Sequence, residues 1–210
     1  MLTLLDIGDL LGTFVFAITG AIAAAEKRLD FGGFLILAFI TAVGGGTIRD
    51  VLLDRGGVFW ADRPQYLGLC ALAALLVFFA GSRVGKLRNT LLWGDAFGLA
   101  LFSVIGAGIA LEAGAGTVMA IMMGVLTCCG GGILREVIRN EVPIILQRDI
   151  YISAALAGST TFVLLMGAGL PALVSGLIGG VVTFGLRAAG IVWKLSLPVY
   201  GGTRGPGAIA

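Results

Sequence analysis

Six uncharged apolar runs divide the chain and restrict it to a membrane fold more strongly than any other feature. The runs cover 10–25, 31–48, 64–82, 96–111, 113–134 and 150–186. About 20 apolar residues span a bilayer as a helix, because the hydrocarbon core is about 30 Å thick. Hydrophobic residues make up 58% of the chain and charged residues only 12%, whereas a soluble domain carries about 25% charged residues. The sequence therefore predicts an all-α, polytopic membrane protein.

The last apolar run is too long for one span, so it must contain a turn that connects two spans. Gly167, Gly169 and Pro171 mark a turn inside it, since glycine and proline end helices and open loops. Dividing the run there predicts seven transmembrane helices. They cover 7–25, 32–54, 65–82, 92–111, 115–138, 150–168 and 171–193.

The positive charges predict how these helices cross the membrane. With the N-terminus outside, 11 of the 14 Lys and Arg residues lie in segments on the cytoplasmic side. Cytoplasmic loops are enriched in Lys and Arg. We therefore expect a multi-pass protein of the cell (inner) membrane with its N-terminus outside and its C-terminus in the cytoplasm.

The chain matches itself after a shift of 86 residues. GDLLGTFVFAITG at 8–20 aligns with GDAFGLALFSVIG at 94–106, and GGGTIRDV at 44–51 aligns with GGGILREV at 130–137. After a one-residue deletion, Arg63 and Tyr66 align with Arg148 and Tyr151. Matches of charged residues and glycine triplets at one offset indicate an internal repeat rather than shared apolar composition.

Each repeat contains three spans, so the second copy enters the membrane from the opposite side. This predicts two inverted three-helix repeats related by an axis in the membrane plane. We expect the first repeat over 1–89, the second over 90–169, and a seventh helix with a cytoplasmic tail over 170–210. Together they form one membrane domain.

The glycine triplets lie inside the second and fifth predicted helices. Each glycine destabilises a helix interior by about 1 kcal/mol relative to alanine, so the triplets are candidates for a break or bend that lines a pore. Close helix packing is the alternative explanation. The candidate pore and hinge residues are Thr41, Gly44, Gly45, Gly46, Thr47, Thr127, Gly130, Gly131 and Gly132.

Charged residues accompany the triplets at matching positions. Arg49–Asp50 and Arg135–Glu136 follow them directly, and ionisable residues at membrane depth are functional candidates. These pairs are predicted to act in gating, in structural pairing at the helix ends, or in both. Asp9 and Asp95 start the first and fourth helices, where they either complement a helix N-terminus or attract cations into a vestibule. Gly8 with Gly12 and Gly94 with Gly98 are spaced for helix packing.

Other classes of protein find no support in the sequence. The chain contains no His, the commonest general base and metal ligand, and no phosphate-binding loop or HExxH motif. No basic run is interleaved with aromatic residues, so nucleic acid is not an expected partner. We expect no enzyme activity, no cofactor and no metal site.

With these residues in view, the chain resembles the bacterial and archaeal branch of the trimeric intracellular cation (TRIC) channel family. GGGTIRDV and GGGILREV in two three-helix repeats, followed by a seventh helix, carry the resemblance over Asp6 to about Trp193. The chain departs from the family pattern at Glu136, where bacterial relatives often carry Asp.

The resemblance implies a homotrimer in membrane lipids, with one pore per protomer between kinked second and fifth helices. It implies passage of monovalent cations, potassium above all and sodium as a further candidate. The same domain has been described as a glycine transporter, so a secondary transporter of a small solute such as glycine is the alternative.

Overall fold

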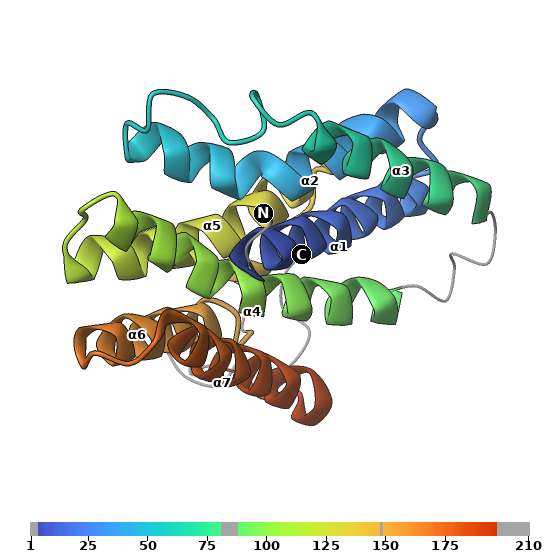
Figure 1. Cartoon of the computed structure of the whole chain (residues 1–210). Coiled ribbons are helices and arrows are strands. Elements are labelled where there is room, and N and C mark those ends of the chain that lie inside the picture. The colour runs from blue at the N-terminus through green and yellow to red at the C-terminus, as the bar shows by residue number, and fades with distance from the viewer. Residues whose placement is uncertain (1–3, 81–87, 148, 197–210) are drawn as a thin grey trace.

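The computed structural model describes residues 4–80, 88–147 and 149–196. In this part of the chain it contains seven α-helices and one short 3-10 helix (Figure 1). Their bounds are α1 Leu4–Glu26, α2 Phe31–Leu52, α3 Gln65–Ala80, α4 Arg88–Glu112, α5 Thr117–Ile138, η2 Ile144–Leu146, α6 Ile152–Gly167 and α7 Ala172–Trp193.

The seven predicted helices are confirmed, and their ends agree to within a few residues. Five of them (α1, α2, α4, α5 and α7) are long and apolar enough to cross a membrane. The other two, α3 and α6, are apolar helices of 16 residues each. They occupy the same position in the two repeats.

The ends of equivalent helices repeat in atomic detail. After α1, Arg28 adopts a positive φ of 53°, and after α4 its counterpart Gly114 has a φ of 79°. Asp54 after α2 and Asn140 after α5 form a second such pair, with φ values of 47° and 55°. A left-handed residue at this position lets the following amides satisfy the last helical carbonyls. The sequence repeat is therefore also a repeat of backbone conformation.

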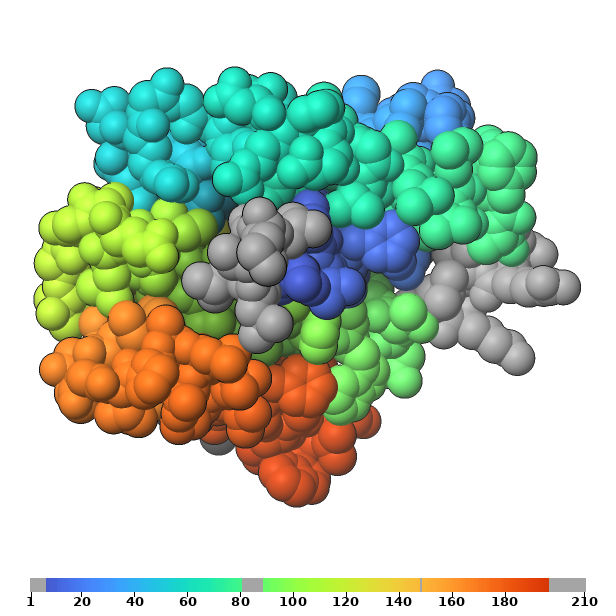
Figure 2. Space-filling view, in the orientation of Figure 1, coloured from blue at the N-terminus to red at the C-terminus, as the bar shows by residue number. Residues whose placement is uncertain are grey.

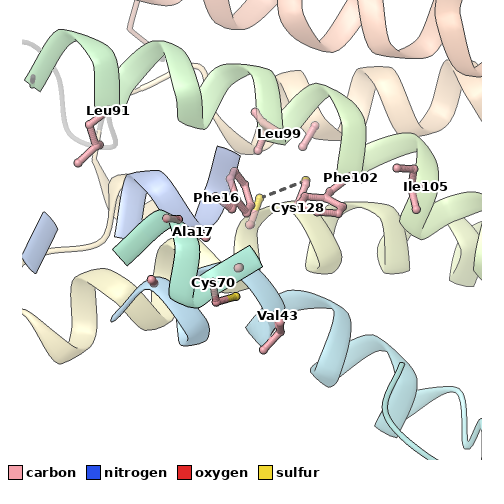
Figure 3. Packing of buried hydrophobic residues seen from close by; sticks show 14 of the residues in the cluster. Phe16, Ala17, Val43, Cys70, Leu91, Leu99, Phe102, Ile105 and Cys128 are labelled. Carbon is pink, nitrogen blue, oxygen red and sulfur yellow. Dashed lines mark hydrogen bonds between the residues drawn. The ribbon is translucent and has the colours of Figure 1, made fainter. Parts of the chain in front are cut away.

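The two repeats pack around α1 and α4, which lie in the middle of the bundle between α2–α3 and α6–α7 (Figure 1). A Cβ atom on Gly12 would lie 2.9 Å from the Phe102 ring, and one on Gly98 would lie 2.0 Å from the Phe16 ring. Phe16 and Phe102 are themselves equivalent residues, and their ring centroids are 5.2 Å apart (Figure 3). Such reciprocal contacts arise from a two-fold axis between antiparallel helices. The inverted repeat and the packing role of these glycines are confirmed.

The outer surface of the bundle is apolar, as a lipid-facing surface requires. Exposed side chains include Phe79 at 78%, Val118 at 75% and Val181 at 70%. In the face drawn in Figure 2, residues of α2 and α3 form one edge, α6 and α7 form the opposite edge, and α5 lies between them. Exposed apolar side chains therefore occur on elements of both repeats and on α7.

The predicted interruption of the second and fifth helices is wrong. Both α2 and α5 are fully described, and each continues as one α-helix through its glycine triplet. The triplets weaken the helix intrinsically, but contacts with the neighbouring helix compensate for that cost, as described below. A bend of either helix axis at the glycines stays a prediction.

Candidate functional site

The glycine triplets bring α2 and α5 into backbone contact. A Cβ atom on Gly45 would lie 2.0 Å from the Thr127 carbonyl oxygen, and one on Gly131 would lie 2.0 Å from the Thr41 carbonyl oxygen. Real Cβ atoms do not approach so closely, so only glycine allows this crossing. Gly45 and Gly131 are equivalent residues, as are Thr41 and Thr127. The two-fold axis therefore passes through this antiparallel crossing.

Two further glycines, which the sequence reasoning did not assign to the site, enclose the threonines. A Cβ atom on Gly20 of α1 would lie 2.7 Å from Thr41 Oγ1, and one on Gly106 of α4 would lie 2.5 Å from Thr127 Oγ1. The Thr127 hydroxyl donates to the Met123 carbonyl at 2.6 Å. The Thr41 hydroxyl is buried and has no hydrogen-bond partner in the part of the chain that the structure describes. The signal was available, because Gly20 and Gly106 repeat at the same 86-residue offset.

Three more residues of the triplets are closely packed, two against side chains and one against backbone. A Cβ atom on Gly44 would lie 2.6 Å from Leu134 Cδ1, and one on Gly46 would lie 2.6 Å from the Phe59 ring. One on Gly130 would lie 2.8 Å from the Gly45 Cα atom. The predicted pore and hinge glycines are thus all packed in this structure.

Thr47 has a different role from the other predicted pore residues. Its hydroxyl donates to the Val43 carbonyl at 2.8 Å and accepts from Trp60 Nε1 at 2.9 Å. Trp60 lies in the connection between α2 and α3. Thr47 therefore holds that connection against α2.

At one end of the crossing, an Arg49 cluster joins Asp9, Arg49, Asp50 and Tyr66. Arg49 donates from Nε and Nη2 to Asp50 Oδ1 at 2.9 and 2.7 Å. The other carboxylate oxygen, Asp50 Oδ2, accepts from the Phe59 amide at 2.9 Å, and Arg55 lies 3.3 Å from Asp50. The Tyr66 hydroxyl donates to Asp9. Both predicted acids at this end are therefore engaged by neighbouring groups.

The Arg49 cluster forms one wall of a cavity of about 660 Å³. A cavity of this size falls in the range of small-molecule sites. A second wall comes from α4, α6 and the start of α7 and is apolar apart from Glu112. Residues of that wall include Val104, Ile105, Gly108, Phe162, Met166 and Gly176.

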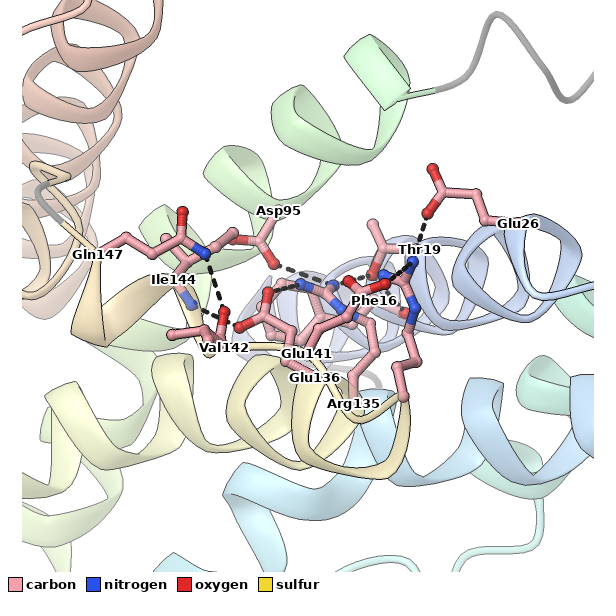
Figure 4. A network of polar contacts seen from close by, with 11 residues as sticks. Phe16, Thr19, Glu26, Asp95, Arg135, Glu136, Glu141, Val142, Ile144 and Gln147 are labelled. Carbon is pink, nitrogen blue, oxygen red and sulfur yellow. Dashed lines mark hydrogen bonds and ion pairs between the residues drawn. The ribbon is translucent and has the colours of Figure 1, made fainter. Parts of the chain in front are cut away.

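At the other end, an Arg135 cluster joins Thr19, Asp95, Arg135 and Glu136 (Figure 4). Arg135 donates to Glu136 Oε1 at 3.0 Å, and to Asp95 Oδ1 and Thr19 Oγ1 at 3.2 Å each. Glu136 Oε2 accepts from the Ile144 amide at 2.6 Å. Arg135 and Asp95 are 1% and 0% exposed. The predicted pairing of Arg135 with Glu136 is present and also includes Asp95.

The two clusters are built alike. Phe59 and Ile144, whose amides bind the two acids, occupy equivalent places once the one-residue deletion is counted. Tyr66 and Tyr151 are also equivalent, and both side chains lie next to their clusters. Sequence reasoning aligned these tyrosines but gave them no role. A tyrosine that repeats together with the charge pair is the signal that would have assigned one.

Among the described residues, no three His, Cys, Asp or Glu side chains are grouped so that they hold a metal ion. The three cysteines are free and buried. The polar chemistry of the site therefore consists of two charge clusters, two threonines and the backbone at the glycine crossing.

Comparison with known proteins now adds the family. The family model described as "Glycine transporter" matches the chain twice, over residues 6–82 and 92–167. Each match covers one of the two three-helix repeats. The family model is thus a single repeat that this chain contains in two copies.

The chain is similar to several proteins that are named as membrane proteins. The UPF0126 inner membrane protein YadS of Escherichia coli K12 is 40% identical over 194 residues, which cover 91% of this chain and 94% of YadS. A UPF0126 membrane protein of Vibrio cholerae is 37% identical and covers 96% of this chain and 85% of its own length.

Solved structures share the whole fold. The TRIC trimeric intracellular cation channel orthologue from Rhodobacter sphaeroides is 46% identical, with a TM-score of 0.87 over 92% of this chain and all of that one. A second structure, from work on conductance through TRIC cation channels, is 32% identical with a TM-score of 0.87 over 97% of this chain. The chain is a multi-pass membrane protein and belongs to the TRIC family.

Proposed function

We propose that the protein is a channel for monovalent cations, potassium in particular, with one path per protomer between α2 and α5. The observation that carries the proposal is the reciprocal approach of Gly45 to Thr127 and of Gly131 to Thr41. The names of the structural relatives, which describe cation channels, point to the same activity.

The crossing suits a path that opens by a small displacement. The Thr41 carbonyl faces Gly131 and the Thr127 carbonyl faces Gly45 of the opposite helix, so no side chain of these glycines separates the carbonyls from the other backbone. If α2 and α5 slide apart, these carbonyls and the two threonine hydroxyls become accessible from the gap. Carbonyl and hydroxyl oxygens replace part of the hydration shell of a monovalent cation.

The charge of the cavity favours cations over anions. Four carboxylates and three arginines line it, so the ionised lining has a net negative charge. Fixed charge of one sign raises the local concentration of the opposite ion. The predicted orientation places this cavity outside the cell and the Arg135 cluster at the cytoplasmic face.

The apolar outer surface and the trimeric relatives support a homotrimer in membrane lipids. Mass measurement of the detergent-solubilised protein should give three chains. A C-terminal reporter should be active in the cytoplasm, and activity only outside would overturn the proposed orientation.

A carrier for a small solute such as glycine is the second candidate. The family description "Glycine transporter" favours it, and so does the cavity on the Arg49 side, because a carrier exposes its site to one side of the membrane at a time. A carrier moves solute in stoichiometric cycles, whereas a channel passes many ions per opening.

One experiment separates the two candidates. The purified protein is placed in a planar bilayer under a potassium gradient, and liposomes containing it are tested for uptake of labelled glycine. Stepwise unitary currents that reverse near the potassium equilibrium potential are expected. Glycine uptake without unitary currents would replace the channel proposal with the carrier.

A further inference from the structure

The seventh helix lies outside the repeat and makes the two ends of the protomer different. Ala172 and Gly176, near the start of α7, line the cavity beside the Arg49 cluster. Arg187, near the end of α7, is only 1% exposed. One end of α7 therefore leaves space with small residues, and the other end fills space with a buried charge.

Arg187 holds the segment that leads into α6. Its Nη1 lies 3.1 Å from Asp149 Oδ1 and donates to the Ile150 carbonyl at 3.4 Å. The guanidinium carbon lies 5.2 Å from the centroid of the Tyr151 ring, within cation–π range. Asp149 also forms a β-bridge with Ser196, just beyond α7. We call Asp149, Tyr151 and Arg187 the Arg187 cluster.

Tyr151 connects the Arg187 cluster to the Arg135 cluster. An ideal Cβ position on Gly132 lies 3.2 Å from the Tyr151 hydroxyl oxygen, and 3.7 Å from both Arg135 Nη2 and Asp95 Oδ1. The three polar groups thus converge beside the last glycine of the α5 triplet. The Tyr151 side chain, 2% exposed, occupies the space between α7 and α5.

The contacts of Arg187 are few for a buried guanidinium. Both polar contacts use Nη1, and its Nε has no hydrogen-bond partner among the described residues. Arg49, by contrast, uses two nitrogens on one carboxylate oxygen, at 2.7 and 2.9 Å. A buried donor without a partner calls for an explanation such as a functional role. The partner Asp149 is 33% exposed, so water reaches the carboxylate that holds Arg187.

We propose that Arg187 is the positioning residue that closes the Arg135 end of the path: it binds Asp149 and holds Tyr151 against Gly132. Release of Arg187 from Asp149 frees Tyr151 and opens that end. This inference deepens the proposed function and rests on it for its meaning in conduction. The closure itself is a property of the structure that is tested without measuring ions.

The test uses the full-length protein in lipid nanodiscs, where both faces meet the reagent. Cys129 lies three residues before Gly132, on the same face of α5, and is 3% exposed. In a background of Cys70→Ala and Cys128→Ala, the rate of Cys129 modification by a water-soluble maleimide reports the opening of this space. Arg187→Gln should raise that rate about tenfold, the factor given by 1.4 kcal/mol.

Matched variants separate positioning from general loosening. Arg187→Lys keeps the charge and should give an intermediate rate, and the exchange of Arg187→Asp with Asp149→Arg should return toward the parent rate. Lys27→Gln removes an ion pair with Glu141 outside the Arg187 cluster and should leave the rate unchanged. If Arg187→Gln does not assemble, Asp149→Asn at the exposed partner takes its place.

The outcomes are distinct. Faster labelling in assembled Arg187→Gln or Asp149→Asn, together with a higher open probability in the bilayer, supports the proposal. Faster labelling without currents in any variant keeps the closure and overturns the channel function. A parent-like labelling rate in both Arg187→Gln and Asp149→Asn, or in whichever of them assembles, overturns the closure.

Discussion

The Arg49 end and the Arg135 end contain the same parts, yet the first lines a cavity, while the second lies beside the buried side chains of Tyr151 and Arg187. In both, an acid that follows an arginine accepts the amide of the next connection, Phe59 in one and Ile144 in the other. The Arg49 cluster borders a space of about 660 Å³. At the Arg135 end, α7 adds Arg187 behind Tyr151. A single helix outside the repeat therefore makes a symmetric core asymmetric.

The arginines themselves are used differently. Arg49 directs its two donor nitrogens to Asp50 on its own helix. Arg135 divides its donors between Glu136 on α5, Asp95 on α4 and Thr19 on α1. The Arg135 cluster thus holds three helices together. Equivalent residues of a repeat therefore need not contribute equally to the stability of the fold.

The largest effect on conductance is expected at the crossing, where the two ends do not differ. Gly45→Leu and Gly131→Leu place a side chain where a carbonyl oxygen already lies at 2.0 Å. The helices must separate, at a cost of about 1–3 kcal/mol or more. Conductance through assembled protein and the melting temperature should both fall for the two variants alike.

Gly68→Leu is the matched control, because nothing lies within 4 Å of its Cβ position. It should behave like the parent. If Gly45→Leu and Gly131→Leu conduct and melt like the parent, the crossing does not form the narrow part of the path.

Removal of the arginines should show the difference between the two ends. Arg135→Ala leaves Asp95 and Glu136 without their shared cation in a buried site, and such a loss costs about 3–5 kcal/mol. Arg49→Ala should cost less, because Asp50 keeps the Phe59 amide and Arg55, which is 40% exposed. Thermal unfolding of the solubilised protein measures both costs, and single-channel recording measures opening.

The opposite order of the two losses of stability would contradict this difference between the ends. A larger loss of stability for Arg49→Ala than for Arg135→Ala would mean that the Arg49 end carries the structure. Equal effects would mean that the contacts of Arg135 with α1 and α4 add nothing to stability.

The acids that follow the two arginines offer a finer test, because Glu136 has a longer side chain than its equivalent Asp50. Asp50 reaches an amide nine residues later, and Glu136 reaches one eight residues later, at 2.6 Å. The extra methylene of Glu136 accompanies the connection that is one residue shorter. Glu136→Asp should therefore lose one hydrogen bond, at about 1 kcal/mol. Inserting one residue between Val137 and Pro143 of the Glu136→Asp variant should restore this bond. A Glu136→Asp variant that is more stable than the parent would contradict this explanation.

The sequence predicted the helices because the apolar runs have membrane length and few competing interpretations. It also predicted the repeat, because charged residues and glycine triplets rarely coincide at one offset. The break at Gly44–Gly46 was wrong because a glycine's intrinsic cost was weighed without the backbone of the opposite helix, which needs that glycine.

Other parts of the site could not be predicted from the chain alone. The contact of Arg187 with Tyr151 joins α7 to the second repeat, and no periodicity in either segment indicates the pairing. The predicted roles of Asp9 and Asp95 as vestibule charges stay predictions. Their contacts with Tyr66 and Arg135 fix their positions but not whether an ion passes them.

The smallest effect concerns two equivalent residues that differ in sign, Arg55 and Glu141. Arg55 turns to Asp50 in its own repeat, while Glu141 lies 2.9 Å from Lys27, beyond α1, and 3.1 Å from Arg139. Burial raises the pKa of Glu141, but Lys27 and Arg139 outweigh it, and the pKa is lowered from its ordinary value of 4.5.

A lowered folded-state pKa stabilises the protein above the ordinary pKa, and the contribution disappears as the pH falls through the lowered value. Because Glu141 and Lys27 are 41% and 40% exposed, solvent screens the pair and the contribution is at most a few tenths of a kcal/mol. Melting temperatures at pH 6 and at pH 3 should therefore differ slightly more for the parent than for Glu141→Gln. Arg55→Gln should leave the part of this difference that comes from Glu141 in place, since Arg55 pairs with Asp50 at the other end of the crossing. An identical pH response of the parent and Glu141→Gln would show that the ion pairs of Glu141 contribute nothing to stability. The buried groups alone would then stabilise the Arg135 end.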